Sequence, residues 1–316
     1  MSGGLSILVC VRNRADLTRA FFGTLVPSIA GEPRPTRGGV EILVYDDLST
    51  DGTPELLGEC RERCAGDLGA ELIVVRGAEQ GCFGTNMNAL AARAAGDTLV
   101  LLNNDMLFEP GWLGPMLRTL DRHGPSIVGN RQVYPAPERA LGRVLNHGGG
   151  AFASDLTPVN LYDGLDADLA PATRTRAMRF VTGACWVVGR ALFNELGGFD
   201  PVFRNGFEDA DLCLRAETHG AGVWYCGESV VGHYGSSTPG RFGRQAENRR
   251  AFVRRWRDAL VPDLEMWTKL DGVEWPPRRP VIDAARALVR APGVSAVAQR
   301  LSAVPVLQRA WRRARR

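Results

Sequence analysis

The sequence predicts an α/β fold in which a mostly parallel β-sheet carries helices on both faces. Two observations support this prediction. Short runs of apolar, largely β-branched residues recur through the first 105 residues, and a segment with helical spacing separates each run from the next. The runs are also apolar at nearly every position, which is typical of parallel strands buried on both faces. Strands and helices that alternate in this way form one layered sheet.

The first third of the chain contains the clearest elements. Four strands are expected, in LSILVCVRNR from residue 5, VEILVYDD from residue 40, ELIVVRG from residue 71 and DTLVLLNND from residue 97. Three helices are expected between them, in ADLTRAFFGTLVPSIA from residue 15, TPELLGECRERCAG from residue 53 and TNMNALAARAAG from residue 85. A helix therefore connects each strand to the next, as parallel neighbours require.

After residue 110 the alternation is less regular. Helices are expected over residues 111–124 and 207–220, and strands over residues 126–134 and 221–235. The stretch RFVTGACWVVGRALFNELGGFD, from residue 179, predicts a strand and then a helix that ends at a Gly-Gly pair. Residues 135–178 are rich in loop-forming residues, and the chain beyond residue 240 has helical spacing interrupted by prolines.

Polar side chains cluster where the strands end. They are Arg12, Asn13 and Arg14, then Asp46 and Asp47, and finally Asn103, Asn104 and Asp105. Because ligands of parallel sheets bind beyond the carboxyl ends of the strands, we expect these side chains to line one crevice. The sequence has no GxGxxG after the first strand and no GxxxxGK[ST], so the usual phosphate cradles are absent. A carboxylate that holds a divalent cation is the expected alternative.

The composition is ordinary for a globular protein. Of the 316 residues, 45% are hydrophobic and 23% are charged, and no apolar run reaches the roughly 18 residues of a membrane-spanning helix. No basic leader precedes the first apolar run, so a secretory signal is not expected. The seven cysteines are an odd number without zinc-site spacing. They fit reduced thiols, and a cytoplasmic location is expected.

The net charge of +3 is unevenly distributed along the chain. Residues 278–316 carry ten arginines and one acid, a net charge of +9, so residues 1–277 carry −6. Apolar residues recur at helical spacing in this basic segment. That pattern predicts either peripheral contact with the inner face of a membrane or a helical pair that packs on the body or on a second copy.

Four stretches, in this order, resemble the large family 2 of inverting nucleotide-sugar glycosyltransferases, which have the GT-A fold. They are VYDDLSTDGT from residue 44, LLNNDMLFEPGWL from residue 101, TGACWVVGRALFNELGGFDPVFRNGFEDADLCLR from residue 182 and VVGHYGSS from residue 230. The resemblance implies a Rossmann-like GT-A domain over residues 1–240. Within it, residues 1–110 would bind the nucleotide and residues 111–240 the acceptor, and residues 241–316 would form a basic helical extension.

The resemblance also implies a divalent cation, Mn²⁺ or Mg²⁺, at the end of the fourth strand. Asp105 is the implied principal ligand, with Asn103 and His233 as further ligands. The family often has an aspartate where this chain has Asn103, and an amide contributes no charge to the site. The alternatives are that the Asn-Asn-Asp triplet only terminates a strand with turn formers, and that His233 is a packed core histidine.

Five residues are implied on the nucleotide side: Arg12, Asp46, Asp47, Asn88 and Asn104. The resemblance assigns Asp46 to the N3–H of a uracil or thymine ring, Asp47 to the ribose and Arg12 to the side of the base. Asn88 is implied to face the diphosphate or the donor sugar.

The segment FEDADLCLR, from residue 207, carries three acids at the start of a helix. Acids there often act only as caps and dipole partners, but three within four residues exceed that need. The resemblance implies that Asp209 deprotonates the acceptor hydroxyl, with Glu208 as its neighbour and substitute. A nearby carboxylate and partial burial would raise the pKa of such a base. We expect Asp211 to hold its helix or a nearby arginine.

Four other residues have open or structural interpretations. Ser49, Asp51 and Gly52 are expected to form the turn into the second helix, a structural role favoured over contact with the nucleotide. His147, in the segment HGGG, is explained equally by a substrate contact and by a flexible loop.

The predicted function is transfer of a sugar from a UDP- or dTDP-sugar to a hydroxyl of a glycan, lipid-linked or small-molecule acceptor, with inversion. Nucleic acid is not an expected partner. Two alternatives stay open. A sugar-phosphate nucleotidyltransferase has a similar sheet but needs a Gly-rich basic loop where this chain has RNRADLTR. A catalytically silent nucleotide-sugar-binding subunit is compatible with Asn103 but disfavoured by Asp105, Asp209 and His233 together.

Overall fold

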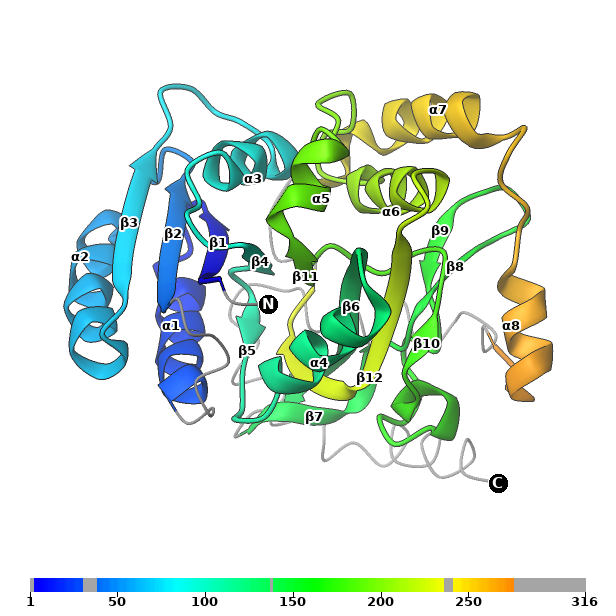
Figure 1. The fold of residues 1–316 in the computed structure, drawn as a ribbon, viewed down its shortest axis with the longest axis horizontal. Helices are drawn as coiled ribbons and strands as arrows, with labels where there is room; N and C mark the ends of the chain where they lie inside the picture. The colour runs from blue at the N-terminus through cyan, green and yellow to red at the C-terminus, as the bar shows by residue number, and fades with distance from the viewer. Residues whose placement is uncertain (1–2, 31–38, 137–138, 236–240, 276–316) are drawn as a thin grey trace, which may run out of the picture. The chain divides into compact units, whose positions relative to one another are not determined.

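The computed structural model describes residues 3–30, 39–136, 139–235 and 241–275. The chain divides into two compact units, Met1–Val273 and Glu274–Arg316, and the fold below is that of the first unit (Figure 1). The basic segment over residues 278–316 lies outside the described residues, and so do the predictions made for it. None of the helices in the described residues is long and apolar enough to cross a membrane.

A mixed ten-stranded sheet forms the centre of the described part of this unit. Its main path runs β10-β12-β6-β11-β4-β1-β2-β3, with β5 paired to β12 and β7 paired to β6. These strands are β1 (Leu5–Val11), β2 (Val40–Asp46), β3 (Glu71–Arg76), β4 (Thr98–Asn103), β5 (Met106–Leu107), β6 (Ser126–Ala136), β7 (Arg139–His147), β10 (Arg176–Ala177), β11 (Cys185–Gly189) and β12 (Gly222–His233). A separate hairpin pairs β8 (Gly150–Phe152) with β9 (Pro158–Asn160).

The first four long strands confirm the predicted parallel arrangement. In β1, Leu5 lies opposite Val40 of β2 and Thr98 of β4, and both pairings are parallel. Ile7 and Val9 of β1 are fully buried, as expected for a strand covered on both faces. Farther along, β11 is antiparallel to both β4 and β6, whereas β12 is parallel to β6. The sheet as a whole is therefore mixed.

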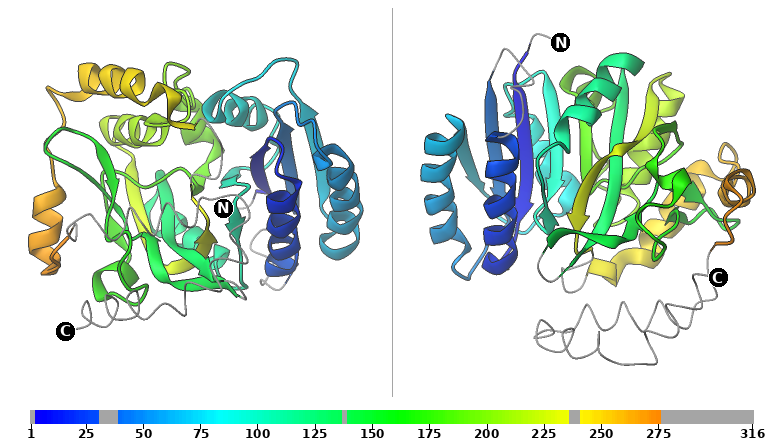
Figure 2. Two further views of the ribbon diagram at one scale, coloured as in Figure 1. Left: turned by 180° about the vertical axis from the view of Figure 1, so that it is seen from behind. Right: turned by 90° about the horizontal axis from the view of Figure 1, so that it is seen from below.

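Helices cover both faces of the sheet. They are α1 (Ala15–Ala30), α2 (Thr53–Arg63), α3 (Phe83–Ala91), α4 (Leu113–His123), α5 (Arg190–Glu195), α6 (Glu208–Thr218), α7 (Gln245–Trp256) and α8 (Leu264–Asp271). Helices α1 and α2 lie on one face of β1–β3 (Figure 2). Helix α3 lies on the other face, because its right-handed crossover runs back from β3 to β4, on the far side of β1.

One region has more regular structure than its local pattern predicts. Residues 135–178 were expected to be rich in loops, yet they contain β7, β8, β9 and β10. Strand β7 forms by antiparallel pairing with β6, and such tertiary pairing overrides weak local propensity. Helices α7 and α8 lie beyond residue 240 in the same compact unit as the sheet. All seven cysteines are free, and six of them are buried.

Candidate active site

A cleft of about 170 Å³ opens at the carboxyl ends of β1 and β4, beside the N-termini of α3 and α6. Eight of the ten residues predicted for the site line this cleft. They are Arg12, Asp47, Asn103, Asn104, Asp105, Glu208, Asp209 and His233. The remaining two, Asp46 and Asn88, are not among the lining residues. The fold thus brings together side chains that lie more than 200 residues apart in the sequence.

Asp105 and His233 are placed side by side by short antiparallel pairing. Strand β5 pairs with the end of β12 so that His233 lies opposite Met106. The next residue, Tyr234, donates its backbone N–H to the carbonyl of Asp105 at 3.0 Å. His233 Nε2 then lies 3.3 Å from Asp105 Oδ1, and both side chains are less than a tenth exposed. These contacts join the loop after β4 to the end of β12.

A hydrogen bond on the other side of the ring orients His233. Its Nδ1 lies 3.0 Å from Asn146 Oδ1. Because an amide oxygen only accepts, Nδ1 donates in this contact. Nε2 faces the Asp105 carboxylate, is buried, and makes no hydrogen bond among the described residues. A divalent cation between these two groups would bind to both.

The Asp105–His233 pair fits a divalent cation. Ligands at neighbouring positions of an octahedral Mg²⁺ site, each about 2.1 Å from the ion, lie about 3.0 Å apart. The observed separation of 3.3 Å is close to that spacing. Within the described residues, no group of three or more His, Cys, Asp or Glu side chains could hold a metal ion. Oxygens of a bound substrate, water or the nearby Asn103 amide would therefore complete the coordination.

A second histidine–asparagine pair lies in the core instead of the cleft. His147 Nδ1 lies 3.0 Å from Asn160 Oδ1, the same contact that His233 makes with Asn146. His147 is fully buried at the end of β7, with its ring against the edges of Phe180 and Tyr225. Burial lowers the pKa of His147 to about 3. The predicted substrate contact is therefore not supported, and the segment proposed as a flexible loop is a buried connection from the end of β7 to β8.

The adjacent acids Asp46 and Asp47 make different contacts. Asp46 is buried, forms an ion pair with Arg76 Nη1, and accepts the backbone N–H of Ser49 at 2.9 Å. Asp47 lines the cleft and accepts the backbone N–H of Gly81 at 2.8 Å. The position of Asp46 favours a structural role, so its predicted contact with a nucleobase stays a prediction.

The loops after β1 and β2 are hydrogen-bonded to each other. Asn13 donates its backbone N–H to Ser49 Oγ at 2.8 Å, and Ala15 donates to Asp51 Oδ2 at 3.0 Å. Asp51 Oδ1 also accepts the N–H of Thr53 at the start of α2. These bonds confirm the structural role predicted for Ser49 and Asp51.

The two arginines of the first loop differ in their partners. Arg14 makes two hydrogen bonds to Asp16, at 2.9 and 2.8 Å, and these bonds raise the pKa of Arg14. Arg12 is exposed on the cleft and has no ion pair within the described part of the chain. Arg12 is therefore the cation available to an anionic ligand.

The side chains of Asn88 and Asn104 also make different contacts. The Asn88 amide donates to the carbonyl of Phe199 at 2.8 Å and accepts the N–H of the same residue at 2.9 Å. Both of its polar ends are thus used to hold the turn before α6, which favours a structural role over the predicted donor contact. Asn104 lines the cleft and donates to Thr18 Oγ1 at 3.3 Å.

The acids of α6 enter the cleft from a strained turn. Asn205 and Phe207 have φ of 55° and 74°, the left-handed region that few non-glycine residues adopt. Glu208 accepts the backbone N–H of Gly206, and Asp209 Oδ2 accepts that of Gly183 at 3.0 Å. Asn13, Arg14 and Leu48 have similar φ values in the loops after β1 and β2. Such strain persists where surrounding contacts hold it, and it is common at functional sites.

Asp211 confirms the structural role predicted for it. It is fully buried and accepts hydrogen bonds from Arg215, Arg255 and Trp256. Glu208 and Asp209 line the cleft, whereas Asp211 does not.

Sequence reasoning missed several residues of the cleft. They include Cys10, Gln80, Cys82, Phe83, Asn86, Thr182, Gly183 and Asn205. For Asn86 a signal existed. Asn86 and Asn88 are two positions apart, about 200° around a helix, so only one of them can face the cleft. The helix starts at Phe83, two residues before the predicted start, and Asn86 lines the cleft whereas Asn88 does not.

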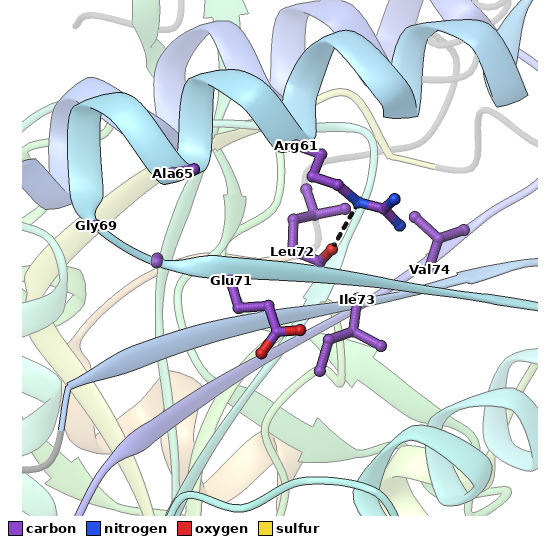
Figure 3. Close-up of a pocket in the computed structure, with 8 residues that line it drawn as sticks. Arg61, Ala65, Gly69, Glu71, Leu72, Ile73 and Val74 are labelled. Atoms are coloured by element: carbon purple, nitrogen blue, oxygen red, sulfur yellow. Dashed lines mark hydrogen bonds between the residues drawn. The ribbon is translucent and has the colours of Figure 1, made fainter.

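A second depression lies between α2 and the edge strand β3 (Figure 3). Its charged residues are Arg61 and Glu71, and Arg61 Nε donates to the carbonyl of Leu72 at 3.1 Å. This contact covers an edge carbonyl. The depression gathers no further chemistry, and the cleft above is the candidate active site.

Curated relatives align with most of this chain. An uncharacterised protein of Sinorhizobium fredii is 29% identical over 264 residues, covering 80% of this chain and 27% of the relative. The O-antigen biosynthesis protein RfbC of Myxococcus xanthus is 28% identical, covering 74% of this chain and 17% of that relative. This chain thus spans about a quarter or less of those two relatives. An N-acetylglucosaminyl-diphospho-decaprenol L-rhamnosyltransferase of Mycobacterium tuberculosis is 26% identical, covering 65% and 70%.

Solved structures with similar folds are GT-A transferases. GalNAc-T7, crystallised with UDP, GalNAc and Mn²⁺, superposes with a TM-score of 0.59 at 16% identity, covering 80% of this chain and 48% of that one. The mannosyltransferase PcManGT from Pyrobaculum calidifontis, in complex with GDP-Man and Mn²⁺, has a TM-score of 0.57 at 19% identity, covering 83% and 66%. These likenesses establish the GT-A fold.

The family model described as glycosyl transferase family 2 matches residues 6–197, which is more than half of the chain. The matched region runs from β1 through α5 and contains the loops that supply Asp47, Asn103 and Asp105. The chain belongs to glycosyl transferase family 2.

Proposed function

We propose that this protein transfers a sugar from a nucleotide-sugar donor, with UDP- or dTDP-sugars favoured, to an acceptor hydroxyl. One observation carries the proposal. A single cleft holds a buried carboxylate–imidazole pair, Asp105 and His233, and the two α6 acids Glu208 and Asp209. The first pair suits a divalent cation on a diphosphate, and the second supplies a base for a hydroxyl.

On the donor side, Asp105 and His233 would hold Mn²⁺ or Mg²⁺, with Asn103 beside them. The cation would offset the negative charge that gathers on the leaving diphosphate. Exposed Arg12 would bind the same anion, and Asp47 and Asn104 would contact the nucleotide. The Mn²⁺ and nucleotides named for the two GT-A neighbours support this assignment.

On the acceptor side, Asp209 would take the proton of the attacking hydroxyl. The hydroxyl oxygen forms a bond to the anomeric carbon while the bond from that carbon to the diphosphate oxygen breaks, and its electrons leave with the diphosphate. Attack opposite the leaving group inverts the anomeric centre. The hydrogen bond from Gly183 N–H holds Asp209 Oδ2 at 3.0 Å and orients the carboxylate.

The domain division and the partners follow from this proposal. Residues 1–110 would bind the nucleotide and residues 111–240 the acceptor, which would be a glycan, a lipid-linked sugar or a small molecule. The M. tuberculosis relative is named for a lipid-linked acceptor, which favours that class. We also propose a cytoplasmic location, since the seven cysteines are free thiols.

Thermal shift measurements against a panel of nucleotide sugars, with and without Mn²⁺, test the proposal. At a hundredfold excess over its Kd, a good donor should stabilise the protein by about 2.7 kcal/mol. This stabilisation should depend on the metal, and the Asp105→Ala variant should lose the metal-dependent part of it. The same variant should have no transfer activity. Near-wild-type turnover by Asp105→Ala with Mn²⁺ would show that the metal assignment is wrong.

A further inference from the structure

Asp211, two residues after the proposed base, is held from outside its own helix. Its side chain is fully buried on α6. It accepts hydrogen bonds from Arg215 Nε at 2.8 Å, Arg255 Nη1 at 2.7 Å and Trp256 Nε1 at 3.0 Å. The last two donors belong to the end of α7, which lies beside α6 (Figure 1). A buried carboxylate needs such partners to keep its charge.

The same arginines also hold the turn that precedes α6. Arg255 Nη2 lies 2.6 Å from Asp200 Oδ2, and its guanidinium lies 5.3 Å from the ring centre of Phe203. Arg215 Nη2 donates to the carbonyl of Gly198 at 2.7 Å. The turn after α5, the acidic helix and α7 are therefore tied together around one buried carboxylate.

Helix α7 holds the far end of this turn as well. Asn248 accepts the N–H of Arg204 at 3.2 Å and donates to the carbonyl of the same residue at 2.9 Å. The next residue, Asn205, accepts the N–H of Phe83 at the start of α3 with its side-chain oxygen at 2.9 Å. Both ends of the turn between α5 and α6 are thus fixed, one at Gly198 and Asp200 and the other at Arg204 and Asn205.

We infer that Arg255 and Trp256 are positioning residues that hold the acidic pair Glu208–Asp209 in register with the cleft. The inference rests on the proposed function, in which Asp209 is the base. Without Arg255 and Trp256, the buried carboxylate of Asp211 would have only Arg215 of these three donors. Helix α6 would then shift to bring this carboxylate into contact with water. A displacement of about 1 Å at a catalytic group can cost up to about 10²-fold in rate. Helix α7 lies outside residues 6–197, which the family model matches.

Trp256→Phe is the sharpest test, because it keeps an aromatic ring in place and removes the indole N–H, and the control loses the same ring volume. Trp267→Phe is the matched control, since Trp267 Nε1 donates to Asp263 Oδ2 at 3.1 Å beside α8. Amide hydrogen exchange over residues 207–211 should accelerate by about fivefold or more in Trp256→Phe and stay unchanged in the control. This readout needs no substrate.

Kinetics then separate positioning from stability. With the donor found in the panel, kcat of Trp256→Phe should fall by about tenfold, whereas the Kd for UDP with Mn²⁺ should stay within about twofold. Arg255→Lys should restore part of the rate lost in Arg255→Met. Arg249→Met should change nothing, because among the described residues Arg249 pairs only with exposed Asp155.

The two hypotheses fail in different ways. If wild-type protein neither binds nor turns over any nucleotide sugar, the proposed function fails. If amide exchange over residues 207–211 is the same in both tryptophan variants, or if kcat of Trp256→Phe equals that of wild type, the positioning role fails. A parallel loss of UDP affinity and kcat would also overturn it, because it would indicate general destabilisation.

Discussion

Two acidic motifs of this protein divide their carboxylates in the same way. At the end of β2, Asp46 pairs with Arg76, whereas Asp47 lies in the cleft. On α6, Asp211 pairs with arginines in the interior, whereas Asp209 lies in the cleft. Each motif thus has one acid that is paired with arginine, whereas the others face the ligand site: Asp47 in the first motif, and Glu208 with Asp209 in the second.

Geometry explains the division. Successive residues of an extended strand point to opposite sides, so the side chains of Asp46 and Asp47 diverge. Positions two apart on a helix are separated by about 200°, so Asp209 and Asp211 point in opposite directions. The comparison teaches that a run of acids is not one functional group. The arginine-paired acids hold the backbone from which the cleft acids project. Loss of an arginine-paired acid should therefore lower stability, whereas loss of a cleft acid should lower ligand binding or turnover.

The largest expected effect is on turnover in Asp209→Asn. The substitution is nearly isosteric but removes the base, so turnover should drop by about 10²–10⁴-fold while donor affinity survives. Steady-state kinetics and nucleotide titration check both parts. Loss of donor binding, together with an equal loss in Glu208→Gln, would instead assign these acids a structural or donor-side role.

Asp46→Asn and Asp47→Asn test the comparison at the other motif. Asp46→Asn leaves Arg76 without its carboxylate and should lower the free energy of unfolding by about 2 kcal/mol. Asp47→Asn should leave stability nearly unchanged and weaken UDP binding. Urea denaturation and UDP titration of both variants separate the two outcomes. Weaker UDP binding by Asp46→Asn, at full stability, would support the nucleobase contact predicted from sequence.

The two histidine–asparagine pairs extend the comparison to metal binding. Removing the partner that orients a metal-binding histidine typically costs about 10–100-fold in metal affinity. Asn146→Leu should therefore weaken Mn²⁺ binding by about that factor, measured by electron paramagnetic resonance with UDP present. Asn160→Leu removes the matching partner of His147, together with a hydrogen bond of 3.3 Å from the Asn160 amide to the carbonyl of Asn146, and should reduce Mn²⁺ affinity much less than Asn146→Leu does. Equal losses in both variants would mean that the effect is one of general stability.

Much of this site could be predicted from the sequence because it lies where regular elements end. Asp47, Asn103 and Asp105 follow apolar strands, and the carboxyl ends of parallel strands meet at one edge. The partners that decide each role could not be predicted in this way. Asn146 lies in a segment without periodicity, and the pairing of Arg255 with Asp211 depends on how α7 packs. Such contacts arise from tertiary packing, which local patterns do not encode.

The smallest expected effect concerns the core histidine, His147. Burial lowers its pKa to about 3 in the folded protein, against 6.5 for a free histidine. Between these values the unfolded chain binds a proton that the folded chain does not, so stability is lost as the pH falls below 6.5. The expected loss is about 1 kcal/mol between pH 7 and pH 5.5.

Urea denaturation at both pH values should reveal this loss in wild type, and His147→Gln should reduce it, even though that variant is less stable at pH 7. His219→Gln is the control, because the side chain of His219 is half exposed, whereas that of His147 is fully buried. A pH dependence that is unchanged in His147→Gln would assign the loss of stability to other groups.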